Sequence, residues 1–492
     1  MNNLKTLAVV GGGTAGFVAA LILKSRFPDL KINLIRSKKI GIIGVGEGST
    51  EHFAEFMKCI GVDWKTIITE CDATFKSGIM FKGWAEEDFL HSLSSDKRPT
   101  FGQYSFLYGK IISENLPNRM MNKHHTWDNQ IYAQNINSEN SPFNQYHFNT
   151  NKLNDFLTKV AISKDIKIID DEILDITFTE DGNIDSLIGE VGTYYSDFYI
   201  DSTGFRKILI SKLGAKWQSY KEYLKMKSAI VFPLGDTEEY NLWTLSQAMD
   251  YGWMFKIPVW GRSGNGYIFD SDYITPDQAK EEIEKLLGHD VEIRKHLSFD
   301  PGALDRVWIK NCCAIGLSAS FVEPLEASSI GTSIQQTFLL MHRLPNYTEN
   351  TIKKYNKDVT DILSNIRDYI LLHYITKKDN TQFWIDAANI SLPNSLQEKL
   401  ELWKNNLPIE DDFNSMTQYS LFKTGNFIQL LYGLKLFDTE QIKKEYNTLP
   451  IPLQNMSDFR LQEILNYEKS TPKLGHKEFV KLCRVERNKL LL

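Results

Sequence analysis

The chain has 492 residues, enough for more than one domain and a large buried core. Its net charge of −6 and 24% charged residues lack the basic surplus typical of nucleic-acid binding. The five cysteines form no CxxC pair and no apolar run reaches about 18 residues, so we expect no disulfide framework, no metal site, no membrane span and a cytoplasmic location.

The chain opens with a pattern typical of a β-α-β unit. Leu4–Val10 is a short apolar run that ends in glycines, which predicts a buried parallel strand. Thr14–Phe27 is the predicted helix that follows, and Lys31–Arg36 is the predicted second strand.

Later segments predict more strands and then mostly helices, without repeats or a clean linker. The predicted strands are Phe198–Asp201, Ser228–Pro233 and Trp253–Val259, and the predicted helices are Leu157–Ile162, Pro276–Leu287, Ile334–Leu344 and Ile352–Thr376. The fold class that we expect is α/β, with a Rossmann-like module and a second, largely helical module.

The motif GGGTAG directly follows the first predicted strand and matches GxGxxG. Gly11 permits the tight turn, Gly13 lets the backbone approach a pyrophosphate, and Gly16 allows close packing of helix on strand. The helix start at Thr14 and Ala15 offers N–H groups to the phosphates. We therefore expect these five residues to bind a dinucleotide; the alternative is a structural glycine-rich turn.

The end of the second strand departs from the dinucleotide-binding pattern. An Asp or Glu that holds the ribose is usual there, but this chain has Arg36 followed by Ser37. We expect Ser37 to bind the ribose, while the guanidinium of Arg36 is suited to stacking on adenine.

Two further segments favour FAD over NAD. Asp201 begins the sequence DSTG at the end of a strand, similar to a second flavin fingerprint, although a simple turn is the alternative. Gly44 and Gly46 lie in a glycine-rich loop that suits a strap over a flat cofactor. Glu47 in the same loop is either a ribose or flavin contact or a solvated acid.

Several segments, taken in order, resemble the flavin-dependent tryptophan halogenase family. They are GGGTAG (11–16), IGVGEGST (43–50), ATFKSGI (73–79), YHF (146–148), IDSTGFR (200–206), GWMFKIP (252–258), GRSGNGY (261–267), FVEPLE (321–326), HY (373–374) and FW (383–384). The matches cover roughly residues 1–405, and the common order makes the resemblance specific.

The resemblance implies a flavin-monooxygenase-like FAD module and a helical substrate module. Residues 1–330 would form the FAD module, interleaved with substrate-module segments at about 80–150 and 215–300, and residues 331–492 would complete the substrate module. A separate flavin reductase would supply FADH2, which with O2 and halide yields hypohalous acid. The acid would pass through a tunnel to a small aromatic substrate, and the enzyme could form a homo-oligomer.

The same resemblance gives Lys76 and Glu326 catalytic roles. Lys76 would act on hypohalous acid either as an ammonium that polarises it or as an amine that forms a haloamine. Glu326 would stabilise the cationic ring intermediate and accept its proton. Ala327 stands where the family commonly has Ser. On residue type alone, Lys76 would be a surface lysine and Glu326 a helix-start acid.

The resemblance also assigns the region between these two sites. Gly316 and Leu325 would contact the cofactor. The backbone N–H groups of Ser328 and Ser329 would bind halide at a helix start, although an ordinary helix cap is the alternative.

A wall between flavin and substrate is implied by a modified WxWxIP motif. Its residues are Trp253, Phe255, Ile257 and Pro258, with Phe255 in place of the second Trp. Strand packing is the alternative for each ring. His91 falls in the stretch that would line the substrate pocket.

Two other functions share some of these motifs. A flavin monooxygenase would keep the glycine loops and DSTG but would not need Lys76, Glu326 and Trp253 together. A non-catalytic FAD-binding protein would need neither the lysine nor the glutamate. Product mass separates the first alternative, and absence of any turnover would favour the second.

Overall fold

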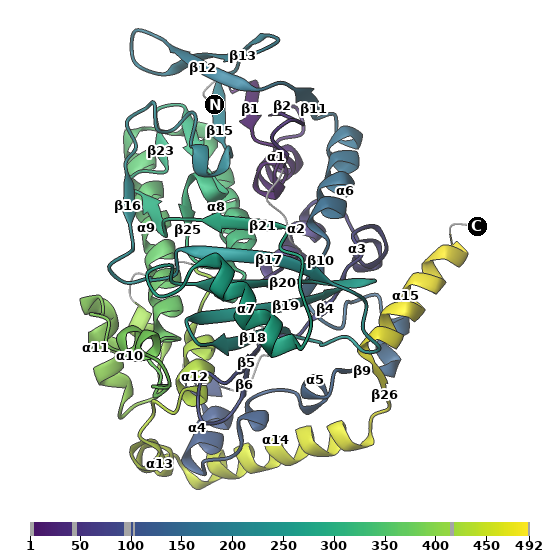
Figure 1. Ribbon diagram of the computed structural model, residues 1–492, viewed down its shortest axis with the longest axis vertical. Helices are drawn as coiled ribbons and strands as arrows, with labels where there is room; N and C mark the ends of the chain where they lie inside the picture. The colour runs from purple at the N-terminus through teal and green to yellow at the C-terminus, as the bar shows by residue number, and fades with distance from the viewer. Residues whose placement is uncertain (1–3, 42–46, 93–99, 102–103, 414–417, 491–492) are drawn as a thin grey trace.

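The computed structural model describes residues 4–41, 47–92, 100–101, 104–413 and 418–490. Two sheets occupy its centre, one above the other in Figure 1, with helices around both. In the part of the chain so described, no helix combines the length and apolar character needed to cross a bilayer.

The upper sheet carries the predicted β-α-β unit. In spatial order its strands are β11 (Lys167–Asp170), β2 (Lys31–Arg36), β1 (Thr6–Val10), β15 (Phe198–Asp201), β24 (Cys312–Ala314) and β23 (Trp308–Ile309). All neighbours pair in parallel except β23 and β24. Helices α1 (Thr14–Arg26) and α8 (Ser328–Arg343) contact each other beside this sheet. Burial of β1 explains its continuous apolar sequence.

The lower sheet is mostly antiparallel. Its strands in spatial order are β21 (Lys295–Ser298), β17 (Ser228–Leu234), β20 (Arg262–Phe269), β19 (Gly252–Val259), β18 (Thr244–Met249), β5 (Ile79–Lys82) and β6 (Phe89–His91). Helix α7 (Pro276–Leu287) packs against it and begins with a capping box between Thr275 and Gln278.

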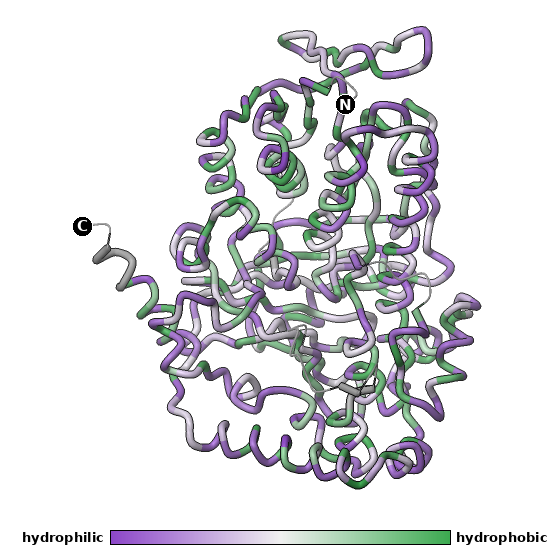
Figure 2. The backbone as a smooth tube through the Cα atoms, turned by 180° about the vertical axis from the view of Figure 1, so that it is seen from behind, coloured by the Kyte–Doolittle hydropathy of each residue, from purple (hydrophilic) through white to green (hydrophobic). Residues whose placement is uncertain are grey.

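A small antiparallel sheet lies beside the lower sheet in Figure 1 and contacts its strand β19. It consists of β3 (Glu47–Gly48), β10 (Gln145–Phe148) and β4 (Thr74–Lys76). Helix α15 (His476–Leu490) contacts β4 and extends outward at the C-terminal end of the chain, as Figure 2 shows from behind. Strand β26 (Lys473–Gly475), just before α15, pairs with β9 (Gln130–Tyr132).

Helices surround the sheets. The main ones not yet named are α2 (His52–Cys59), α3 (Trp64–Glu70), α4 (Phe106–Ser113), α5 (His124–Trp127), α6 (Thr150–Ser163), α9 (Glu349–Leu372), α10 (Gln382–Ala388), α11 (Asn394–Trp403), α12 (Thr424–Gly433), α13 (Thr439–Asn447) and α14 (Ile451–Ser470). The helical character expected after about residue 328 is confirmed.

The predicted segments lie largely within elements of the predicted type, but α6 begins at Thr150 and not at Leu157, and α8 begins at Ser328 and not at Ile334. Two other differences have local causes. The first strand begins at Thr6, because the N–H groups of Lys5 and Thr6 donate to the Asp197 carboxylate instead. Helix α9 ends at Leu372 and not at Thr376, because the chain tightens there and His373 N–H donates to the carbonyl three residues back.

Candidate active site

The glycine loop after β1 has the geometry that a pyrophosphate requires. Gly11 has a φ of +123°, and a Cβ there would lie 2.1 Å from the Ser202 carbonyl oxygen. A Cβ on Gly16 would lie 2.1 Å from the Gly11 carbonyl oxygen, so both positions exclude a side chain. A Cβ on Gly13 would meet nothing within 4 Å. The space above Gly13, at the start of α1, therefore fits a phosphate-containing cofactor.

Arg36 lies across this loop at the end of β2. Its Nη1 donates to Thr158 Oγ1 at 3.2 Å, and its guanidinium lies 5.9 Å from the ring centroid of Phe17. A Cβ on Gly12 would come within 2.5 Å of the Arg36 side chain. Ser37, the expected ribose contact, is half-buried beside it.

Asp201 organises the DSTG turn through its own carboxylate. Oδ1 accepts hydrogen bonds from the N–H and hydroxyl of Thr203 and from the Ser318 hydroxyl, at 3.0, 2.7 and 3.1 Å. Oδ2 accepts from the N–H groups of Leu209 and Ile210 at 2.8 and 2.9 Å. The Asp201 carboxylate, predicted to bind the cofactor, thus already accepts hydrogen bonds from protein donors. These bonds hold the DSTG turn in place next to the glycine turn.

The start of helix α8 faces a pocket beside the glycine turn. Gly316 has a φ of +71°, and a Cβ there would lie 2.5 Å from the Cβ of Ala15. Ala327 takes a left-handed conformation, and α8 begins at the next residue. Ser328 and Ser329 line this pocket together with Gly316. The predicted halide residues and one predicted cofactor residue therefore lie together.

Leu325 lies buried in the 3-10 turn Pro324–Glu326. Two other predicted cofactor residues, Gly44 and Gly46, fall outside the described residues, as does the side chain of Glu47. The backbone of Glu47 pairs with Phe148 at the edge of the small sheet.

Lys76 is fully buried at the end of β4. Its Nζ donates to the Ser49 carbonyl oxygen at 2.8 Å. A Cβ on Gly48 would come within 3.3 Å of that Nζ, so the glycine leaves room for the amine. Burial lowers the pKa of Lys76 to about 8, although the charge of Glu326 opposes this shift.

Glu326 is also fully buried, and two histidines bind it. His91 Nδ1 lies 2.9 Å from Oε1, and His373 Nε2 lies 2.9 Å from the same oxygen. Burial alone would raise the pKa of Glu326, but the charges and hydrogen bonds of His91 and His373 outweigh it and lower the pKa to about 2. This arrangement maintains a buried carboxylate.

The predicted wall is a buried part of β19. The rings of Trp253 and Phe255 lie 6.1 Å apart between centroids. Trp253 Nε1 donates to Oε1 of the buried Glu323 at 3.2 Å. The Pro258 carbonyl oxygen accepts a hydrogen bond of 2.7 Å from the Thr74 hydroxyl, which links β19 to β4, the strand of Lys76. Ile257 is buried as well.

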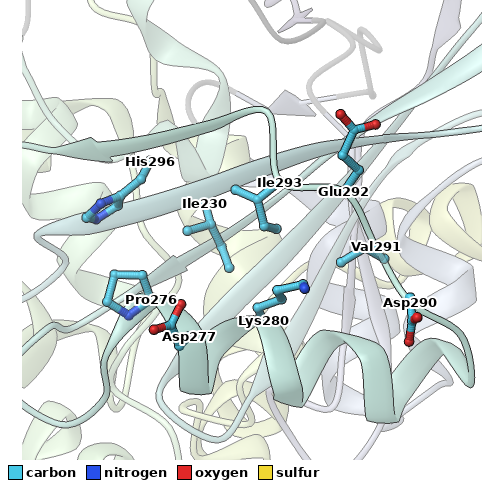
Figure 3. A pocket seen from close by; sticks show the side chains of 9 residues that line it. All are labelled: Ile230, Pro276, Asp277, Lys280, Asp290, Val291, Glu292, Ile293 and His296. Atoms are coloured by element: carbon cyan, nitrogen blue, oxygen red, sulfur yellow. The ribbon is translucent and has the colours of Figure 1, made fainter.

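A separate hollow lies on the outer side of the lower sheet, against α7 (Figure 3). Its lining includes Ile230, Pro276, Lys280, Val291, Ile293 and His296. None of the predicted site residues contributes to it, so it is distinct from the candidate active site.

Comparison with known proteins identifies the family. Residues 6–448 match the model described as Tryptophan halogenase. The 7-chloro-L-tryptophan 6-halogenase KtzR of Kutzneria sp. (strain 744) is 31% identical over 458 residues, covering 82% of this chain and 85% of that protein. This chain belongs to the tryptophan halogenase family.

Solved halogenase structures have the same fold. The tryptophan halogenase of Shewanella frigidimarina NCIMB 400 matches with a TM-score of 0.89 and 25% identity over 98% of both chains. The tryptophan 6-halogenase SttH of Streptomyces toxytricini matches with a TM-score of 0.87 and 24% identity, covering 98% of this chain and 100% of that one. The expected fold class, an FAD-binding module with a helical substrate module, is confirmed.

As a member of this family, the protein is a flavin-dependent halogenase and thus an oxidoreductase that uses reduced FAD, O2 and halide. The family implies a small aromatic substrate and a separate flavin reductase. The open space at Gly13, at the start of α1, fits the cofactor on structural grounds as well.

No sequence pattern assigns an individual role to two histidines of this halogenase site. His373 appeared only within the matching pair HY, and it contacts Glu326. His476 lies beyond the matched segments, and its Nε2 accepts the backbone N–H of Phe75, next to Lys76. No spacing signal links either residue to its partner, because both contacts join distant parts of the chain. His91, predicted to line the substrate pocket, contacts Glu326.

Proposed function

We propose that this halogenase places a halogen on an electron-rich aromatic substrate of the indole, tryptophan-like or phenolic class, and that Lys76 and Glu326 direct the transfer. One observation carries the proposal. An amine and a carboxylate from distant parts of the chain are both fully buried, and their charges interact. Burying two such groups is costly unless they have a function or complete pairing.

The cofactor would lie along the glycine turn. Gly11, Gly13 and Gly16 would hold its pyrophosphate at the start of α1, and Ser37 would hold the ribose. When bound, reduced FAD supplies the reducing equivalents with which O2 and halide yield hypohalous acid. Ser328 and Ser329 would bind the halide through the first N–H groups of α8.

Lys76 would bind the oxidant. With a pKa of about 8, its side chain is mostly an ammonium at neutral pH. Within the described part of the chain one N–H is used, by the Ser49 carbonyl, which leaves two for the oxygen of hypohalous acid. Hydrogen bonding to that oxygen weakens the oxygen–halogen bond, whose electron pair leaves with oxygen as the halogen joins the ring.

Glu326 would complete the substitution. The halogenated ring carries a positive charge, which a buried carboxylate stabilises. The ring carbon then loses its proton to Glu326, and the C–H electron pair restores the aromatic ring. The balance is one hypohalous acid and one arene giving one haloarene and one water. Trp253, Phe255, Ile257 and Pro258 would keep the arene away from the flavin.

Relatives with tryptophan in their names support an indole substrate, while Ala327 and Phe255 depart from the family pattern and leave phenols in the candidate class. We propose that the enzyme is cytoplasmic and can form a homo-oligomer. Its FAD module would comprise residues 1–330, interleaved with substrate-module segments at about 80–150 and 215–300. Residues 331–492 would complete the substrate module.

A substrate panel tests the function. The full-length protein with FAD, a flavin reductase and chloride, bromide or iodide would be given indoles, phenols and pyrroles, and products would be read by mass spectrometry. We expect the isotope pattern of chlorine or bromine on at least one indole or phenol. Products that gain only one oxygen, or no product from any substrate, would refute the proposal.

A further inference from the structure

The hydrogen bonds around Glu326 indicate where the protons are. His91 Nδ1 lies 2.9 Å from Glu326 Oε1 and 3.1 Å from Oε2, and His373 Nε2 lies 2.9 Å from Oε1. All three side chains have no exposed surface. Every polar atom in this cluster therefore depends on its protein neighbours for a partner.

The neighbouring Asn426 indicates which ring nitrogen of His91 carries the proton. Lys423 N–H donates to Asn426 Oδ1 at 2.7 Å, so the amide nitrogen of Asn426 points the other way. That nitrogen lies 3.2 Å from His91 Nε2 and donates to it. His91 Nε2 is thus an acceptor, and the Tyr369 hydroxyl, 3.0 Å from the same nitrogen, can also donate to it. A neutral His91 with its proton on Nδ1 satisfies all of these neighbours, since Nδ1 donates to Glu326.

His373 has acceptors on both sides. Its Nδ1 lies 2.9 Å from the backbone carbonyl oxygen of Tyr369, which can only accept. Its Nε2 lies 2.9 Å from Glu326 Oε1. A neutral imidazole has a single N–H and cannot donate to both. The pair of His373 and Glu326 must therefore hold one additional proton.

We propose that His373 carries this additional proton as an imidazolium, and that it is a positioning residue which keeps Glu326 ionised and ready to accept a proton from the substrate. The inference rests on the proposed role of Glu326 as proton acceptor.

The other titratable groups around this cluster are consistent with that charge. Lys76 on β4 interacts with Glu326 through its charge, but its amine donates to the Ser49 carbonyl. Burial and the charge of Glu326 raise the pKa of Tyr369, on α9, well above its usual range, so its hydroxyl stays neutral. Glu323 is turned toward Trp253 and Tyr374, and burial raises its pKa to about 8.

The geometry also assigns the two carboxylate oxygens different tasks. Oε1 receives a hydrogen bond from each histidine, whereas among the residues that the structure describes Oε2 has only the longer contact with His91. The proton released by the ring carbon would thus go to Oε2. The C–H bond breaks, its electron pair returns to the ring, and His373 retains both of its protons throughout.

A direct test does not need turnover. Nitrogen NMR of the full-length protein with FAD, labelled with 15N-histidine, should show at pH 8 one histidine with both ring nitrogens protonated. That signal should be absent from His373→Gln and should lose its second proton in Glu326→Gln. A spectrum at pH 8 in which every histidine has only one protonated nitrogen would overturn the inference, even if the enzyme halogenates.

A matched pair of variants tests the consequence for catalysis. His373→Gln and His91→Asn both retain a neutral amide donor near Glu326, but only the first removes the proposed charge. We expect single-turnover halogenation by His373→Gln to fall at least about tenfold between pH 9 and pH 6, one pKa unit being tenfold. His91→Asn should lower the rate without this slope. Equal slopes in both variants, or a slope in His91→Asn alone, would overturn the charge assignment.

Discussion

His476 Nε2 accepts a hydrogen bond of 3.0 Å from the backbone N–H of Phe75, across a separation of 401 residues. Its Nδ1 lies 3.2 Å from the Asn241 carbonyl oxygen, so the imidazole is neutral with its proton on Nδ1. Burial lowers its pKa to about 4, which keeps it neutral at physiological pH. The first residue of α15 thus fastens β4 immediately before Lys76.

Replacing His476 should damage both stability and catalysis. His476→Ala would leave the Phe75 N–H buried without its acceptor, a loss of about 1–3 kcal/mol in the free energy of unfolding. We expect kcat to fall as well, because the strand of Lys76 loses its support. Urea unfolding and steady-state kinetics measure the two effects. The exposed His289, changed to Ala, is the control; equal behaviour of the two variants would contradict the anchoring role.

Removing the amine should stop halogen transfer but not cofactor binding. Lys76→Ala is expected to retain normal FAD affinity by fluorescence titration, because the lysine is assigned to the oxidant and not to the flavin. Haloarene product should drop to background. Lys285→Ala, an exposed lysine on α7, should keep full activity. Halogenation by Lys76→Ala above a trace would contradict the assigned role.

The buried amine should also reduce stability, with a defined pH dependence. The pKa of Lys76 is about 8 in the folded protein against 10.5 as the usual value, so the unfolded chain binds more protons between these values. Stability of the wild type therefore rises with pH across this window. Lys76→Met should be more stable at pH 7 by up to about 3 kcal/mol, and the difference should shrink toward pH 10. A difference that stays constant in urea unfolding would argue against this.

Neutralising the carboxylate should slow the chemical step. Glu326→Gln is expected to lower kcat by about 10² or more, the usual scale for a positioned acid–base group. FAD binding should not change, since the carboxylate is bound by two histidines. Kinetics at saturating substrate measure the effect, with the exposed Glu281→Gln as control. Near-normal turnover would remove Glu326 from the mechanism.

The glycine turn offers a closely matched test of cofactor binding. A Cβ would meet nothing within 4 Å at either Gly13 or Gly235, so neither substitution clashes with protein at that atom. Gly13→Val should nevertheless weaken FAD binding, because its side chain would occupy the space of the pyrophosphate. Gly235→Val should titrate like the wild type. Equal flavin affinity in both variants would count against the proposed location.

Local patterns explain why much of this molecule was predictable. The glycine turn depends on a few consecutive residues, so Gly11 and Gly16 identify it in the sequence, and the apolar run of β1 predicts a buried strand. Lys76 and Glu326 were found only through a family resemblance, since residue type alone favours a surface lysine and a helix-start acid.

The remaining contacts could not be predicted, because tertiary packing alone selects them. His373 follows the last turn of a long amphipathic helix, and its sequence context is the same as that of any buried helical histidine. Only the folded chain brings it to Glu326. Arg36 is a second case: its position predicts stacking on adenine, but Thr158 and Phe17 determine where its side chain lies.

The long separation between Phe75 and His476 has a consequence for biosynthesis. On the ribosome, the glycine turn emerges first, and the rest of its sheet has emerged by Ala314. The strand that bears Lys76 gains its hydrogen bond to His476 only after almost the whole chain has been translated. A nascent or prematurely terminated polypeptide would thus acquire the flavin site before the lysine that controls the oxidant is held in place.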